Sequence, residues 1–184
     1  MRRNIHWFLA GILFFVPFFW LKQGEMDLGG DSGRLYFYDP VAFIKNVSLY
    51  HIVPEGLGSA EPNTYFLPYV ALLALLKFIF QSPTIVIDIV TGLKLSIGFL
   101  AMYAIVKTML LATYNKQRIN YISLAAILSG IFYVFAPNMV GNYDKALTSH
   151  NQVFLNPLMF YLLLKFFSEN NFRYLLAAIG LSFV

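Results

Sequence analysis

Long runs of apolar residues alternate with short polar segments along this chain. Runs that approach the length of a membrane-spanning helix cover residues 5–21, 84–110, 121–136 and 152–167, and a shorter run begins at Tyr174. A helix needs about 20 mostly apolar residues to cross the hydrocarbon core of a bilayer. Because 59% of the residues are hydrophobic and 12% are charged, the chain lacks the polar surface of a soluble globule. We therefore predict an all-α, polytopic transmembrane helical bundle.

The charged residues limit the classes of partner. The 13 Lys and Arg residues outnumber the nine Asp and Glu residues, but they stand singly between apolar runs, as membrane-flanking anchors do. Nucleic-acid binding would need a basic patch or stripe. The chain has no cysteine, which excludes disulfides and thiolate metal sites. The predicted partner is the lipid bilayer, with no nucleic acid.

The position of the cations predicts the topology. The segment 65–80 is apolar but short, and it contains Pro68 and Lys77. If it crossed the membrane, the basic loop 113–120 would face the side opposite to Arg2, against the positive-inside rule. We therefore predict a re-entrant or interfacial helix at 65–80. The protein is then a multi-pass integral protein of the plasma or inner membrane, with a cytoplasmic N-terminus.

Most of the acidic residues fall on the opposite, extracytoplasmic side in this topology. The two outer loops cover residues 22–64 and 137–151, and they carry Glu25, Asp27, Asp31, Asp39, Glu55, Glu61 and Asp144. The first loop is also rich in glycine, which lets a backbone bend tightly and approach a ligand. We expect the functional site on this face.

The last apolar run, from Tyr174, has about half the length that a span needs. We therefore expect residues 1–184 to be the N-terminal part of one transmembrane domain.

The first loop contains a specific pattern. In QGEMDLGGDSGRLYFYDPVAFIKNV, Asp31 stands eight residues before Asp39-Pro40, Phe43 follows, and EPNTYFLP leads into the segment 65–80. This pattern resembles the first outer loop of class C (GT-C fold) membrane glycosyltransferases, most closely the bacterial arabinofuranosyltransferase type. The order of spans and loops along the chain is also similar to that of the oligosaccharyltransferase catalytic subunit.

The resemblance implies a transferase of the cell envelope that uses a polyprenyl-phosphate sugar donor and a glycan, lipid or protein acceptor. It implies that Asp31 is the general base or a metal-organising carboxylate. Asp144 resembles the acidic residue of the family's second outer loop, although it stands alone where the family has an acidic pair. Mg²⁺ or Mn²⁺ held by Asp31 and Asp144 is the cofactor that this implies.

Such a transfer needs a base for the acceptor hydroxyl and positive charge for the departing phosphate. The candidate substrate-binding residues are Arg34, Tyr36, Asp39, Lys94 and His150. Lys94 lies deep in the span 84–110, where ionisable residues usually face a bundle interior and pair or serve function. We expect Lys94 to bind a lipid phosphate or to pair with Asp88. Asp88 stands close to the start of the same span, where an interfacial carboxylate favoured by the helix dipole is the simplest interpretation.

Two other functions fit parts of the pattern. In a transporter or lipid-flipping subunit, Asp88, Lys94 and the segment 65–80 would line a substrate path, but broken helices should then recur in two halves. In a non-catalytic membrane scaffold the fold would persist without a site.

Overall fold

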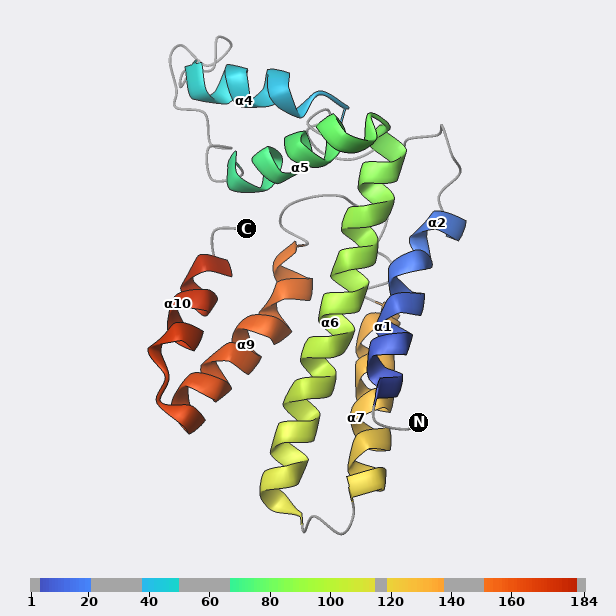
Figure 1. Ribbon diagram of the computed structural model, residues 1–184, viewed down its shortest axis with the longest axis vertical. Helices are drawn as coiled ribbons and strands as arrows, with labels where there is room; N and C mark the ends of the chain where they lie inside the picture. The colour runs from blue at the N-terminus through green and yellow to red at the C-terminus, as the bar shows by residue number, and fades with distance from the viewer. Residues whose placement is uncertain (1–3, 21–37, 50–66, 115–118, 138–150, 182–184) are drawn as a thin grey trace.

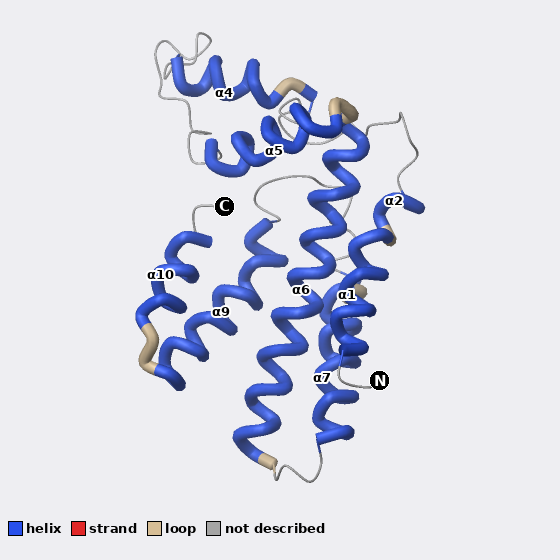
Figure 2. Tube along the Cα trace, viewed as in Figure 1, coloured by secondary structure: helices blue, strands red, loops and turns tan. Residues whose placement is uncertain are grey.

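The computed structural model describes residues 4–20, 38–49, 67–114, 119–137 and 151–181 (Figure 1). Every regular element in these ranges is a helix, and none of the residues they contain lies in a strand (Figure 2). The all-α class predicted from the apolar runs is therefore confirmed for the described part of the chain.

A long central helix organises the structure. The helices are α1 (Ile5–Phe15), α2 (Pro17–Trp20), α4 (Pro40–Leu49), α5 (Leu67–Phe80), α6 (Pro83–Thr113), α7 (Ile119–Val134), α9 (Asn151–Glu169) and α10 (Phe172–Leu181). Figure 1 shows α1 and α7 on one side of α6, α9 and α10 on the other, and α4 and α5 lying across the end where α6 begins. We call that end of α6 the cap end.

Within the described ranges, α6 is the one helix that is both long and apolar enough to cross a membrane. It starts one residue before the predicted run 84–110. The Ser82 hydroxyl accepts a hydrogen bond from the Ile85 N–H at 3.5 Å, and Pro83 occupies the first helical position. Shorter apolar helices cover Ile5–Trp20, Leu67–Phe80, Ile119–Val134 and Phe172–Leu181.

The run 5–21 does not form one uninterrupted α-helix. It is divided at Val16 into α1 and α2. Pro17 has no N–H to donate to the carbonyl of Leu13. The Val16 N–H keeps its regular bond to the Ile12 carbonyl at 3.2 Å and also donates to the Leu13 carbonyl, with 3.4 Å between nitrogen and oxygen. A proline within an apolar run thus shortens the first helix.

The predicted outer loop 22–64 contains a helix that the sequence analysis did not anticipate. In α4, a carboxylate oxygen of Asp39 accepts a hydrogen bond from the Ala42 N–H at 3.0 Å, and Pro40 occupies the first position. Asp before Pro is a strong helix start, because the side chain caps a free N–H and proline has none to leave unpaired. The signal was present in Asp39-Pro40.

A sharp turn redirects the chain from α5 into α6. Gln81 has a φ of 57°, in the left-handed region that few residues other than glycine adopt. Its N–H still donates to the Lys77 carbonyl at 2.7 Å, which closes the last turn of α5. This turn lets α5 lie across the cap end of α6 instead of continuing its axis (Figure 1).

Small residues let the bundle helices approach α6 closely. A Cβ atom at Gly130 of α7 would lie 2.9 Å from the Phe99 carbonyl oxygen of α6, and one at Gly92 of α6 would clash with the Phe14 carbonyl of α1. The Ser96 hydroxyl donates a hydrogen bond of 2.8 Å to the Ala10 carbonyl. Close approach at small residues and hydroxyl bonds between helices are typical of membrane bundles.

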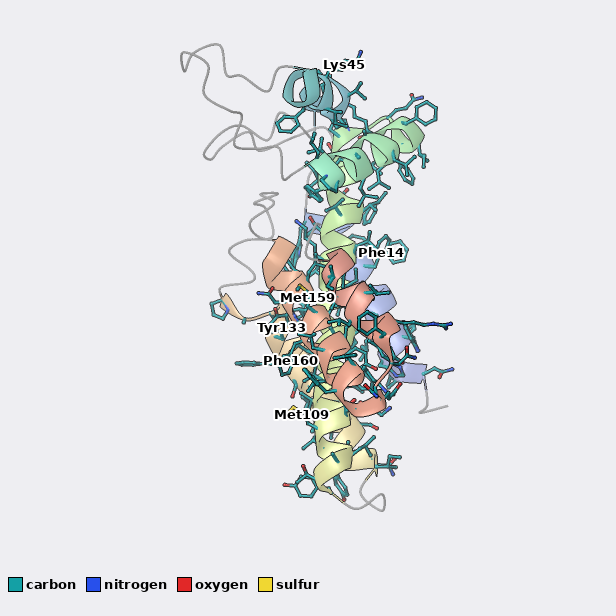
Figure 3. All side chains as sticks on the ribbon, turned by 90° about the vertical axis from the view of Figure 1, so that its left-hand side faces the viewer. Phe14, Lys45, Met109, Tyr133, Met159 and Phe160 are labelled. Atoms are coloured by element: carbon teal, nitrogen blue, oxygen red, sulfur yellow. The ribbon has the colours of Figure 1, made fainter. Side chains whose placement is uncertain are left out.

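Two separate hydrophobic clusters result. The bundle cluster comprises Ala10, Leu13, Leu95, Phe99, Val134 and Phe154. The junction cluster, between α5 and the cap end of α6, comprises Tyr69, Val70, Leu73, Val86, Ile87 and Val90. In the sticks view, Phe14 and Tyr133 lie along the bundle, Lys45 projects from α4, and Met109 lies toward the other end of α6 (Figure 3).

The helix directions bring several helix ends to the cap side. α1 and α2 run toward it, α6 runs away from it, α7 returns toward it, and α9 starts from it (Figure 1). The described helices that flank residues 21–37 and 138–150 therefore reach those segments from the same side of the bundle.

Candidate functional site

Two of the predicted site residues, Asp39 and Lys94, belong to the described part of the chain. The others lie outside the described residues: Asp31, Arg34, Tyr36, Asp144 and His150. Their roles, including a metal ion shared by Asp31 and Asp144, stay predictions. The site is therefore built here from the side chains at the cap end of α6.

Asp39 has a local task. It is exposed, and its carboxylate caps α4 through the bond from the Ala42 N–H. One carboxylate oxygen thus satisfies a free backbone donor at a helix start. The cap accounts for Asp39 without a ligand, and its predicted contact with substrate stays a prediction.

Lys94 is held by an aromatic ring of the neighbouring helix. Its Nζ atom lies 6.0 Å from the centroid of the Tyr69 ring, which belongs to α5. The alternative expectation, an ion pair between Lys94 and Asp88, is wrong, since neither carboxylate oxygen of Asp88 has a hydrogen-bond partner. Residues six apart on a helix project from different faces, whereas pairs three or four apart are neighbours.

A second cation–π contact ties α5 to the start of α4. The Lys77 Nζ atom, on α5, lies 5.3 Å from the centroid of the Tyr38 ring. A cation within about 6 Å of an aromatic face is attracted by the ring quadrupole. The two cation–π contacts therefore link α5 to α6 through Lys94 and to the start of α4 through Lys77. Sequence spacing alone did not reveal these contacts.

Asp88 is the unusual group at the cap end. Its side chain is 0% exposed, and both carboxylate oxygens are buried with no hydrogen-bond partner. Asp88 stands close to the start of α6, as the interfacial interpretation requires, but neighbouring side chains cover its carboxylate completely; its depth in a membrane stays a prediction. Burying a polar group without a partner costs free energy, and buried charges are normally paired or bound to a metal ion.

The face of α6 that carries Asp88 is the face turned to the bundle. Thr84, Asp88 and Thr91 are all buried and are spaced as i, i+4 and i+7, so they form one stripe. The stripe continues to Leu95 of the bundle cluster. The opposite face, with Val86 and Val90, packs on α5.

Asp88 thus faces away from the transverse helices and toward the side from which α1 and α9 approach α6. It lies about 8 Å along the axis from the start of α6, at 1.5 Å per residue. An ionisable residue within an apolar span is the sequence signal that points to such a position. The spacing of the two threonines around it would have sharpened that signal.

Metal ligands do not gather in the part of the chain that the structure describes. No group of three or more His, Asp and Glu side chains suited to a metal ion occurs there. Comparison with models of known protein families, with curated proteins and with solved structures gives no significant match to this chain. The resemblance to class C glycosyltransferases therefore rests on the sequence pattern quoted above.

Proposed function

We propose that this protein is a polytopic membrane glycosyltransferase that transfers a sugar from a polyprenyl-phosphate donor to an extracytoplasmic glycan, lipid or protein acceptor. The observation that carries the proposal is Asp88, a carboxylate buried without a partner at the cap end of α6. A bound sugar hydroxyl or cation would supply the missing partner once the side chains that cover Asp88 move aside. Burial and unsatisfied charge of this kind are characteristic of functional sites.

The arrangement of helices supports the placement of the site. The described helices that flank residues 21–37 and 138–150 have their adjoining ends toward the cap side of the bundle (Figure 1). α5 lies across the end of α6 and not beside it, as a re-entrant or interfacial helix would. We propose that this side is extracytoplasmic and that the turn between α6 and α7 is cytoplasmic, as the basic loop favours.

In the proposed reaction, Asp31 accepts the proton of the acceptor hydroxyl. The acceptor oxygen then bonds to the anomeric carbon of the donor sugar. The bond from that carbon to the phosphate oxygen breaks, and polyprenyl phosphate leaves with the electron pair. Positive charge from Arg34, His150 or a bound divalent cation would stabilise the leaving phosphate. Asp88 would accept a hydrogen bond from a sugar hydroxyl and so orient the donor.

The test is transfer from a defined donor. Membranes from cells that express the full-length protein are incubated with a panel of radiolabelled polyprenyl-phosphate sugars, and the label that reaches glycan, lipid or protein is measured. We expect one donor to be used, and we expect Asp31→Asn to abolish its use. The absence of transfer from every donor, in membranes where the protein is folded, would contradict the proposal.

A buried charge in a membrane helix also suits a transporter or lipid-flipping subunit, and Asp88 is the observation that favours this second function. The same membranes distinguish the two. A flipping subunit would move a fluorescent polyprenyl-phosphate sugar from one leaflet to the other without changing its covalent structure. A transferase releases polyprenyl phosphate.

A further inference from the structure

The structure contains a cavity far from the cap end. Its volume is about 360 Å³, and it lies between α1, α6 and α9. Aliphatic side chains line most of it: Ile97, Leu100, Ala101, Ala104 and Leu158. Aromatic and imidazole side chains complete its wall: His6, Trp7, Tyr103 and Tyr161.

A polar cluster stands at the wall of this cavity. The Lys107 ammonium donates a hydrogen bond of 2.9 Å to the Tyr103 hydroxyl and lies 5.1 Å from the centroid of the Tyr103 ring. The His6 ring stacks on Tyr103 with centroids 4.5 Å apart and planes 11° apart. An ammonium has three N–H donors, so the Tyr103 bond leaves two of them for a ligand.

The position of Lys107 along α6 matches the depth of a lipid headgroup. Asp88 and Lys107 are 19 residues apart on one helix, which corresponds to about 28 Å of rise. The hydrocarbon core of a bilayer is about 30 Å thick. If Asp88 lies near one boundary of the core, Lys107 therefore lies near the other, with the apolar cavity wall on the hydrocarbon side of it.

We propose that this cavity binds an anionic phospholipid, with an acyl chain between α1 and α9 against α6 and the phosphate at Lys107 and His6. Aliphatic walls exclude a polar solute from the cavity, and a cation at its edge favours an anionic headgroup over a zwitterionic one. Tyr103 and Trp7 are residue types that settle at the membrane–water boundary. This lipid site is separate from the proposed transfer site, because it lies toward the end of α6 opposite to the cap end.

Retention of added lipid by the purified protein tests the proposal. The detergent-solubilised full-length protein is mixed with phosphatidylglycerol, with phosphatidylcholine of the same chains, or with glycerol 3-phosphate alone, and bound molecules are counted by mass spectrometry of the intact complex. We expect retention of phosphatidylglycerol, weaker retention of phosphatidylcholine and none of glycerol 3-phosphate. Retention of the soluble phosphate alone would make the site an anion site and overturn the proposal.

Variants identify the site. Lys107→Gln should reduce the affinity for phosphatidylglycerol about fivefold and bring it close to that for phosphatidylcholine, while Lys107→Arg should keep the preference. Ala104→Leu, which fills the cavity, should reduce retention of both lipids. The matched control is Lys77→Gln, because Lys77 also lies over a tyrosine ring but at the cap end.

The control should bind lipid as the unmodified protein does. Equal retention of the two lipids by the unmodified protein, or an unchanged preference in Lys107→Gln, would overturn the proposal. Thermal unfolding of each variant in detergent shows that it is folded, so a loss of lipid cannot be confused with a loss of structure.

Discussion

The charged residues toward the two ends of α6, Asp88 and Lys107, have opposite environments. At the cap end, Asp88 is fully buried and neither of its carboxylate oxygens has a hydrogen-bond partner. Toward the other end, Lys107 is partly exposed, donates to the Tyr103 hydroxyl and lies against that ring. One charge is kept away from both water and protein partners, and the other has a partner and remains accessible.

Lys107 has a partner within the fold, whereas Asp88 has none. A long lysine side chain can lay its methylene stem along apolar surface and carry its charge to the boundary. The short side chain of an aspartate cannot do so, and an unpaired carboxylate inside a protein lowers stability. We infer that the cap end tolerates Asp88 because a ligand completes it.

The largest effect that we expect is that of Asp31→Asn, because Asp31 is the proposed general base. The substitution keeps the volume of the side chain but removes its charge, so transfer should fall by roughly 10²–10⁴ from the loss of acid–base assistance alone. Initial rates with the labelled donor measure it. Asp27→Asn is the control and should have a smaller effect. If Asp27→Asn abolished transfer and Asp31→Asn did not, the base would be assigned to the wrong carboxylate.

Removal of metal ions tests whether the proposed transfer reaction uses a divalent cation. If Asp31 and Asp144 share a divalent cation, a chelator should stop transfer and Mg²⁺ or Mn²⁺ should restore it, because a cation held by a single carboxylate in water binds weakly. Asp144→Ala should then raise the metal concentration needed for half-maximal rate, by about tenfold or more. Full activity in excess chelator would leave Asp31 as a base that needs no metal ion.

Between the two ends of α6, the close packing of α7 on α6 should make the stability of the protein sensitive to one added methyl group. Gly130→Ala places a Cβ atom 2.7 Å from the Phe99 ring and 2.9 Å from its carbonyl oxygen. We expect it to destabilise the protein by about 1–3 kcal/mol, measured by thermal unfolding in detergent. Gly11→Ala is the matched control, because a Cβ atom there meets nothing within 4 Å; alanine's better helix propensity should stabilise it slightly. Equal effects of both would show that α6 and α7 are not packed this closely.

Asp88→Asn tests directly whether that carboxylate serves function or fold. Removing an unpaired buried charge should raise the melting temperature, while transfer should fall about tenfold through the loss of one charge-assisted hydrogen bond to the substrate. The two readouts therefore move in opposite directions, which a structural role would not produce. A lower melting temperature with unchanged transfer would place Asp88 in the fold. Glu169→Gln, at an exposed carboxylate, is the control.

The smallest expected effect is on thermal stability, and it concerns Glu169, the control position. The hydrogen bond of 2.5 Å from Lys165 lowers the pKa of the Glu169 carboxyl below its ordinary value. A lowered pKa in the folded state stabilises the protein above the unfolded pKa, and the stabilisation is lost as the pH falls through the folded value. Melting temperatures of the unmodified protein and Glu169→Gln should differ slightly at pH 7 and converge as the pH falls below the ordinary pKa of a glutamate. A difference that persists at low pH would have another origin.

The sequence by itself determined the helical class and most helix positions. A single apolar run can satisfy its backbone groups within itself, without water, by forming a helix. The sequence also carries local signals for helix starts: Ser82-Pro83 stands at the start of α6 and Asp39-Pro40 at the start of α4. Pro17 marks the break between α1 and α2. These are effects within one or two turns, which a sequence carries directly.

The tertiary structure alone decided which charges meet. Sequence spacing suggested that Lys94 would pair with Asp88, but the pairing depends on which neighbour covers each face of α6. α5 turns back across the cap end and presents Tyr69 to Lys94, while Asp88 faces the bundle without a partner. The cavity beside Tyr103 likewise exists only because α1 and α9 approach α6 together. Such contacts join residues far apart in the chain, and their geometry is set by helix packing rather than by local pattern.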